Sequence, residues 1–356
     1  MRRILTDTIK GNEILARDIL SSSGITIIPA GKPIKKEYVG RLKQLDIDYL
    51  YVYDDKSQGV EIEKDIETIV TERYQRKISQ KIEDFCFQSQ GELEKISSIA
   101  EEIMNDVLSN KEVLYSISGI RRKSEEIYSH CINVSALSVL ISIKLELPKN
   151  QIKDIAIGSL LHDIGYTHIS SEMMELKYEN CSPEEKLDLK KHVVYGYSIV
   201  MKEKWMNKNT KDIILSHHEK IDGSGFPFNK KGKEINIESR IVAVCDYFDS
   251  MAYGYLTKKR KVYEVIDLLV KNKGIKFDKD IVNVLQSSVA AYPNGSLIVT
   301  NNGDLGMVLR LNLKYLRKPI IRLLEDKYGN RYNEWIEKDL HLETHLGIWD
   351  TVEKEI

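Results

Sequence analysis

The middle of the chain, over residues 111–288, repeats apolar side chains at the spacing of amphipathic α-helices. In one stretch Ile127, Val134, Leu137, Ile141 and Leu145 fall on the same helical face. Such a face must be buried against other elements, which requires a helical core. We therefore predict a mainly α fold, in a chain whose 356 residues are enough for two or three domains.

The residues before this core predict a small domain and a connection. Within residues 1–60, apolar runs flank a serine-rich turn, and an amphipathic helix over residues 34–45 leads to a strand at 49–52. This pattern is typical of an α/β accessory domain. Residues 61–110 are rich in Glu, Lys, Ile and Gln, with a single Gly and no Pro, which favours long, solvent-facing connecting helices.

Residues 289–356 change to the pattern of β-structure. Apolar segments at 297–299, 307–311 and 319–324 alternate with turns that contain Asn and Gly. The sequence therefore predicts a small C-terminal β-rich extension after the helical core.

The charge balance excludes one large class of function. Lys and Arg number 53 against 54 Asp and Glu, so the chain lacks the positive field of a protein that binds DNA or RNA through phosphates. No apolar run approaches the roughly 20 residues of a membrane-spanning helix. The polar N-terminus does not resemble a secretory signal, so we expect a cytoplasmic protein without a membrane partner.

The four cysteines are scattered and form no CxxC pair. This spacing argues against both a zinc knuckle and a disulfide framework. We expect reduced, mostly buried thiols at Cys86, Cys131, Cys181 and Cys245.

Histidine is concentrated in the helical region, where six of the eight histidines lie between His130 and His218. The pair His162-Asp163 ends an apolar helix just before Gly165, which suits a helix C-terminus. The pair His217-His218 precedes Glu219 and a turn-rich loop at 222–227. Adjacent histidines on a helix point about 100° apart, so they can serve neighbouring metal ions.

Asp246 lies in an unusually apolar context, residues 241–248. A buried carboxylate without a partner is costly, and a cation is the partner we favour over a salt bridge to Arg240. The β-branched residues at 241–244 suggest a strand by propensity, whereas a metal ligand here suits a buried helix.

These motifs, in this order, resemble a known family over about half of the chain. His130, His162-Asp163 and Asp246 resemble the H…HD…D signature of the HD phosphohydrolase superfamily, and His192 with the later histidine pair and loop resembles its HD-GYP branch. The resemblance implies one metal ion held by His130, His162, Asp163 and Asp246, and a second held by His192, His217 and His218 and bridged by Asp163. Glu126, one helical turn before His130, matches the position of a ligand for a third metal.

The resemblance also implies an activity. HD-GYP proteins hydrolyse cyclic di-GMP, a bacterial messenger, to linear pGpG and often on to GMP. Mixed imidazole and carboxylate ligands suit iron or manganese. Two or three such ions imply in-line attack by a hydroxide that the metals share. Cyclic di-GMP or a related cyclic dinucleotide is the expected ligand. A diguanylate cyclase-type partner and a homodimer through the charged helices are left open.

The residues that contact phosphate depart from the family pattern. Tyr166 replaces the lysine of HDIGK, and Tyr255 stands where the family has an arginine, so two positive charges are lost. Lys258 keeps a basic position, and we expect Lys258 and Tyr166 to assist catalysis at the phosphates beside His162 and Asp163. Substrate contacts are expected at Tyr166, Tyr255, Lys258, Gly223 and Gly225.

Two other functions remain alternatives because of these substitutions. One is a degenerate HD-GYP protein that senses a cyclic dinucleotide or binds a partner without cutting, and the other is a phosphohydrolase for another nucleotide. Elsewhere, His341 and His345 have the spacing of a helical metal pair, but their flanks suggest a strand or loop, so we read them as surface residues. We assign no role to His168.

Overall fold

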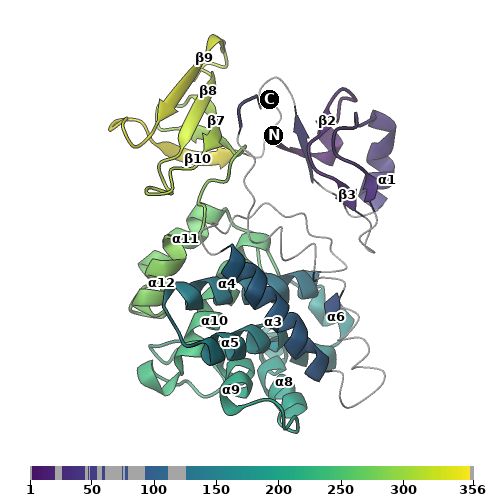
Figure 1. Cartoon of the computed structure of the whole chain (residues 1–356), viewed down its shortest axis with the longest axis vertical. Helices are drawn as coiled ribbons and strands as arrows, with labels where there is room; N and C mark the ends of the chain where they lie inside the picture. Colours follow the sequence, from purple (N-terminus) through teal and green to yellow (C-terminus); the bar gives the residue numbers. More distant parts are fainter. Residues whose placement is uncertain are drawn as a thin grey trace. The chain divides into compact units, whose positions relative to one another are not determined.

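A computed structural model describes residues 2–20, 26–44, 47, 49–53, 58–60, 74, 77–78, 93–110 and 126–352. The chain divides into two compact units, and each is described by itself (Figure 1). The first comprises Met1–Asp65, Ser116–Ser124 and Val289–Ile356. The second, which is helical, comprises Ile66–Tyr115 and Glu125–Ser288. The domain limits predicted at residues 60, 110 and 288 stay predictions.

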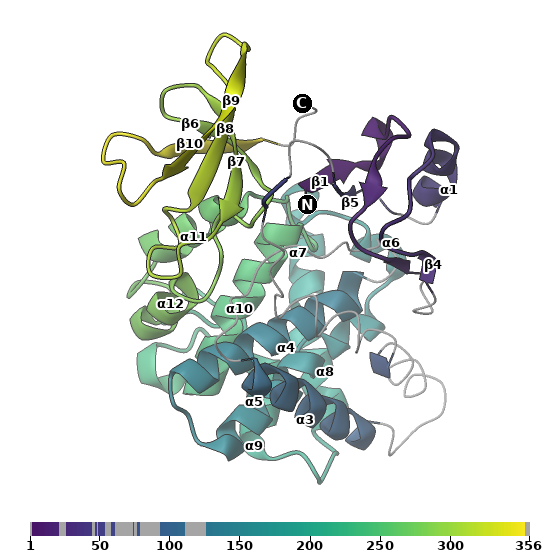
Figure 2. The same ribbon diagram turned by 45° about the horizontal axis from the view of Figure 1, so that its top comes forward.

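The helical unit is built around α4, which packs against α3, α5 and α10 (Figure 2). On the side of α5, the bundle continues through α9, which packs against both α5 and α8. The helices are α3 (Glu94–Ser109), α4 (Glu126–Lys144), α5 (Lys149–Leu161), α6 (Ser171–Met174), α7 (Pro183–Lys190), α8 (His192–Val200), α9 (Lys208–Ser216), α10 (Ile237–Tyr253), α11 (Val262–Lys271) and α12 (Lys279–Gln286).

Helix α4 is buried all round over residues 129–142, not only on its predicted apolar face. Small polar residues such as Ser135 and Ser138 let neighbouring helices approach its other side. Ser135 donates to the carbonyl of Ala156 on α5, at 3.1 Å. Residues 127–144 are apolar enough to cross a membrane, but 78% of this segment is buried in the bundle. Burial in a core accounts for that composition.

Helix α3 corrects the expectation of solvent-facing connecting helices for residues 94–109. It buries Ile96, Ile99, Ile103 and Val107 and packs against α4 and α5, and Glu101 pairs with Lys153 on α5 at 2.5 Å. The apolar residues of α3 recur at intervals of three and four, so charged and polar residues occupy its outer face. Most of residues 61–92, including Cys86, lie outside the described residues.

Residues 241–244 are helical, although their β-branched side chains favour a strand. The side chain of Asn236 caps the N-terminus of α10 by accepting from Ser239 N–H at 2.8 Å, and Gly254 ends the helix with φ +80°. Caps and burial against α4 therefore outweigh local propensity.

The N-terminal part of the first unit is an α/β fold, as predicted. Its sheet is antiparallel in the order β1-β5-β2, beside a β3-β4 hairpin and helix α1. The helix expected over residues 34–45 is shorter, because Pro33 bridges to Ile14 and Ile34 is a buried core residue before a 3₁₀ turn. The elements are β1 (Arg2–Leu5), β2 (Ile14–Leu15), β3 (Ile19–Leu20), β4 (Thr26–Ile28), α1 (Val39–Gln44) and β5 (Tyr49–Tyr53).

The C-terminal part of the first unit is an antiparallel five-stranded sheet in the order β10-β6-β7-β8-β9, which confirms the predicted β-rich extension. Gly303 and Gly329 supply the positive φ of two hairpin turns. Val60 packs into this sheet with Leu297, Met307 and Leu309. The strands are β6 (Leu297–Thr300), β7 (Leu305–Arg310), β8 (Ile320–Glu325), β9 (Arg331–Asp339) and β10 (Ile348–Val352).

Candidate metal centre and active site

Five separate elements of the helical unit bring the predicted ligands together. His130 lies on α4, His162 caps the C-terminus of α5, and Asp163 follows it. His192 begins α8, the pair His217-His218 follows α9, and Asp246 lies within α10. All of these side chains are buried except His218, which is partly exposed. The side chain of Glu126, the predicted third-metal ligand, lies outside the described residues.

A glycine permits the close approach of two of these elements. A Cβ atom at Gly165 would lie 1.9 Å from the carbonyl oxygen of His192. Only glycine therefore lets the turn after Asp163 abut the start of α8. This contact sets the distance between Asp163 and His192.

The carboxylate of Asp163 stands between two groups of imidazoles. Its Oδ2 lies 3.6 Å from His130 Nε2 and 3.4 Å from His162 Nε2. Its Oδ1 lies 3.4 Å from His192 Nε2 and 3.7 Å from His217 Nε2. Ligand atoms about 2.1 Å from one metal ion lie roughly 3 to 3.4 Å apart, so one distance in each group has this spacing and the other exceeds it by only about 0.2 to 0.3 Å. His218 joins the second group.

Hydrogen bonds on the far side of the rings fix the orientation of three imidazoles. The Nδ1 of His162 donates to Ser159 O at 2.7 Å, that of His192 to Leu189 O at 2.6 Å, and that of His217 to Ile214 O at 3.0 Å. A carbonyl only accepts, so Nδ1 carries the proton and Nε2 presents a lone pair. Such an outer bond is typical of metal-binding histidines.

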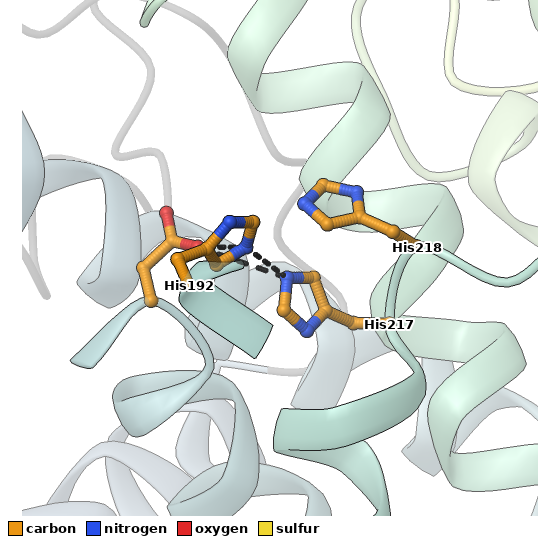
Figure 3. A group of neighbouring side chains, drawn as sticks. His192, His217 and His218 are labelled. Atoms are coloured by element: carbon orange, nitrogen blue, oxygen red, sulfur yellow. Dashed lines mark hydrogen bonds and ion pairs between the residues drawn. The ribbon is translucent and has the colours of Figure 1, made fainter. Parts of the chain in front are cut away.

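In the second group, three acceptors face one another without a hydrogen between them. His192 Nε2 and His217 Nε2 are 3.4 Å apart (Figure 3). Both atoms also lie within 3.7 Å of Asp163 Oδ1. Burial lowers the pKa of His192 to about 4, so its ring is neutral. Three converging lone pairs repel unless a cation lies among them. The cluster can therefore bind a metal ion.

His130 differs from the other imidazoles because its far side faces a carboxylate. Its Nδ1 donates to Asp249 Oδ2 at 2.7 Å, and its Nε2 lies 3.3 Å from Asp246 Oδ1. Burial lowers the pKa of His130, but the hydrogen bonds to Asp246 and Asp249 outweigh it and raise the pKa to about 9. Asp249 is a partner that the sequence reading missed.

Asp246 faces the cluster and has no ion pair with Arg240. Its Oδ2 lies 3.5 Å from His218 Nδ1, and Ser250 donates to its Oδ1 at 3.0 Å. Arg240 instead pairs with Asp278 at 2.6 Å. Burial raises the pKa of Asp246, but His130 and His218 lower it well below its usual range overall, so the group is a carboxylate.

The two tyrosines that replace basic residues lie against the imidazoles. Tyr166 stacks on His192 with ring centres 4.2 Å apart, and Tyr255 stacks on His130 at the same separation. Burial raises the pKa of both phenols well above 10, so both stay protonated. The buried hydroxyl of Tyr255 has no hydrogen-bond partner within the described residues.

Glu219 and two glycines shape the loop after the histidine pair. The carboxylate of Glu219 accepts the backbone N–H groups of Phe228, at 2.7 Å, and Lys230, at 3.0 Å. Gly223 has φ +83°, and a Cβ at Gly225 would lie 2.4 Å from Glu219 Cα. Both glycines are therefore required by the backbone path of the loop.

A pocket of about 430 Å³ opens beside the cluster, with His218 in its wall. We call it the lysine pocket, because Lys190, Lys220 and Lys276 line it together with Phe226, Tyr247 and Phe277. Burial lowers the pKa of Lys220 to about 8. Sequence reasoning missed all three lysines. Lys220 directly follows Glu219, and that position beside a ligand pair was the available signal.

Lys258 lies elsewhere, on an exposed segment, and is not among the described residues that line the pocket. Its backbone N–H donates to Glu179 at 3.1 Å. Of the other histidines, His341 lies in a turn in the C-terminal part of the first unit, where it stacks on Tyr315. Cys131, Cys181 and Cys245 are free and buried.

Comparison with known proteins places this arrangement in a family. Residues 99–281 match the family model described as "HD domain", which is about half of the chain, and the chain belongs to this family. The fold is similar to a solved HDG"Y"P protein from Bdellovibrio bacteriovorus, with a TM-score of 0.54, 20% identity, and coverage of 80% of this chain and 97% of that one. The predicted HD-GYP resemblance is confirmed.

Curated relatives match part of the chain. A cyclic di-GMP phosphodiesterase of Pseudomonas aeruginosa is 28% identical over 64% of this chain and 55% of its own length. A 3'3'-cGAMP-specific phosphodiesterase of Vibrio cholerae is 29% identical over 50% of this chain and 34% of its own length. The chain thus spans about half of the first relative and about a third of the second.

Proposed function

We propose that this chain is a metal-dependent phosphodiesterase that hydrolyses cyclic di-GMP to pGpG, to GMP, or to both. The observation that carries the proposal is the convergence of His192 Nε2, His217 Nε2 and Asp163 Oδ1, three acceptors that need a cation among them. The similarity to a named cyclic di-GMP phosphodiesterase supports the choice of substrate.

We propose as metal ligands the residues that the sequence singled out, with Asp163 shared by two sites and Glu126 reserved for a third ion. Imidazole and carboxylate donors favour iron or manganese. When bound, two such ions would supply Lewis acidity and lower the pKa of the water that attacks the phosphodiester in line. The outer hydrogen bonds of His130, His162, His192 and His217 keep their Nε2 atoms aimed at the cluster.

The tyrosines are proposed to assist the phosphate as neutral donors. Both phenols stay protonated, and the Tyr255 hydroxyl has a hydrogen to donate and no acceptor within the described residues. A phosphate oxygen at the cluster would accept it. Lys258 would act from the exposed segment that follows Tyr255, and Gly225 would let the ligand approach the loop backbone.

The relative from Vibrio supports a second substrate, cyclic GMP-AMP. Both cyclic dinucleotides contain the same phosphodiester linkage, which the cluster would cleave, and they differ in one base. A substrate panel that compares them with linear pGpG separates the two specificities. A cytoplasmic location, where such messengers act, is part of the proposal, and a homodimer and a diguanylate cyclase-type partner stay predictions.

The test replaces Asp163 by asparagine, which keeps its shape and removes its charge. The protein is purified without oxygen, its metal content is measured, and products of cyclic di-GMP are separated by chromatography. Asp163→Asn should lose most of the metal and all turnover. Asp188→Asn is the matched control, because Asp188 only pairs with Lys191 at the surface. Full metal content and turnover in a folded Asp163→Asn protein would refute the proposal.

A further inference from the structure

The wall of the lysine pocket contains three lysines, which make it positively charged. Within the part of the chain that the structure describes, no carboxylate lines it, and Lys190, Lys220 and Lys276 form no ion pair. Three ammonium groups in one pocket wall, with no paired carboxylate, repel one another. An anion that entered the pocket would relieve this repulsion.

The acidic groups nearest to Lys220 are already engaged elsewhere. Asp222 accepts from the backbone and the hydroxyl of Ser224, at 2.9 and 2.7 Å. Glu219 accepts two backbone N–H groups of the loop, and Asp246 faces His130 and His218. These carboxylates attract Lys220 from a distance, but none of them forms an ion pair with it.

Aromatic rings alternate with the lysines in the pocket wall. Lys220 Nζ lies 4.5 Å from the ring centre of Phe277, and Lys190 Nζ lies 5.3 Å from that of Phe226. Phe226 stacks on His218 at 4.7 Å. These contacts hold the ammonium groups over aromatic faces, where they keep donors to spare. Phe226, which is half-buried, leaves part of its surface to a ligand.

Ammonium groups beside aromatic rings suit a ligand with both phosphate and a base. Phosphate accepts charge-assisted hydrogen bonds from lysine, and a purine stacks on an aromatic side chain. The volume of about 430 Å³ falls in the range of roughly 300 to 1,000 Å³ of small-ligand sites. A nucleoside monophosphate unit has this chemistry, whereas an inorganic ion would leave the rings unused.

We infer that the lysine pocket binds one purine nucleotide unit of the substrate, with its phosphate held by Lys190, Lys220 and Lys276 and its base against Phe226. The identity of the whole substrate rests on the proposed function. Because His218 belongs both to the pocket wall and to the cluster, a dinucleotide can place one phosphodiester at the cluster and its other nucleotide in the pocket. The pocket lysines thus replace the charges that Tyr166 and Tyr255 lack.

The test measures binding of GMP to the whole protein, kept metal-free with a chelator, by calorimetry. Guanosine and inorganic phosphate are the partial ligands. GMP should bind more tightly than either one, because it uses both halves of the pocket. Lys220→Gln and Lys190→Gln should each weaken GMP binding at least about tenfold, the loss expected for one charge-assisted hydrogen bond. Lys202→Gln, at an exposed lysine of the same unit, should leave it unchanged.

The Phe226→Ala variant tests the contact with the base independently of the contacts with the phosphate. It should weaken GMP about tenfold or more and leave inorganic phosphate unchanged, because only stacking is lost. Thermal unfolding of each variant establishes that it is folded. If the Lys220→Gln variant fails to fold, the GMP affinity of the Lys190→Gln variant alone tests the inference. Wild-type affinity for GMP in the folded lysine variants, or no GMP binding by the wild-type protein, overturns the inference.

This experiment also separates the inference from the proposed function. Lysine-dependent GMP binding by a protein that never cleaves cyclic di-GMP would refute only the proposed function. Cleavage of cyclic di-GMP with an unchanged KM in Lys190→Gln and Lys220→Gln would refute only the inference.

Discussion

Replacing Gly165 by alanine should disrupt one half of the metal centre through the backbone alone. The added Cβ would lie 1.9 Å from the His192 carbonyl oxygen, and ordinary contact begins at 3.4 Å. The turn after Asp163 and the start of α8 must therefore separate by about 1.5 Å. Metal–ligand bonds tolerate only about 0.2 Å, so His192 and Asp163 can no longer share an ion.

The group formed by Asp163 with His130 and His162 does not include α8, so it should survive. We expect the metal content of Gly165→Ala to fall to about half of the wild-type value, with loss of turnover and about 1 to 3 kcal/mol of stability. Elemental analysis and denaturant unfolding measure these effects. Gly40→Ala is the control, since nothing lies within 4 Å of a Cβ there. Wild-type metal content and turnover in Gly165→Ala would refute the reasoning.

Three further predictions concern the cluster and the core. Asp249→Asn, which alters the partner of His130 Nδ1 at 2.7 Å, should weaken metal binding about 10- to 100-fold in competition with a chelator; equal affinity would show that this bond does not tune the ligand. Removing metal from the wild-type protein should lower its unfolding temperature, because the facing lone pairs of His192 and His217 lose their cation, and an unchanged temperature would contradict this reading. Burial raises the pKa of Cys131 and Cys245, so a thiol reagent should label them only after unfolding, and rapid labelling of the native protein would count against their burial.

The sequence predicted the elements whose signals are local. The helix that ends at His162 and the strands of the C-terminal sheet follow from apolar spacing and glycine turns, and the structure has them. The strand propensity of residues 241–244 was misleading because burial on all sides suits a core helix as well as a strand. The charged character of residues 61–110 concealed the buried face of α3.

The ligand set could be proposed because paired motifs carry a strong signal, whereas the groups around it could not. Asp249 acts through His130, and Lys190, Lys220 and Lys276 meet only after folding. A single lysine in a sequence rich in lysine carries no such signal. The sequence does not show that α7, the loop after α9 and the loop before α12 bring these lysines to one pocket.

The attachment of residues 58–60 to the C-terminal sheet sets a rule for dissecting the protein. Arg322 donates to the carbonyl of Gln58 at 2.5 Å, and Val60 fills the same apolar cluster as Met307. Truncating the chain after α12 would remove the strands that pack against Val60. The side chain of Val60, which is buried in the whole protein, would then be exposed to water. Shortened versions intended for biochemistry should therefore remove both flanks together, or neither.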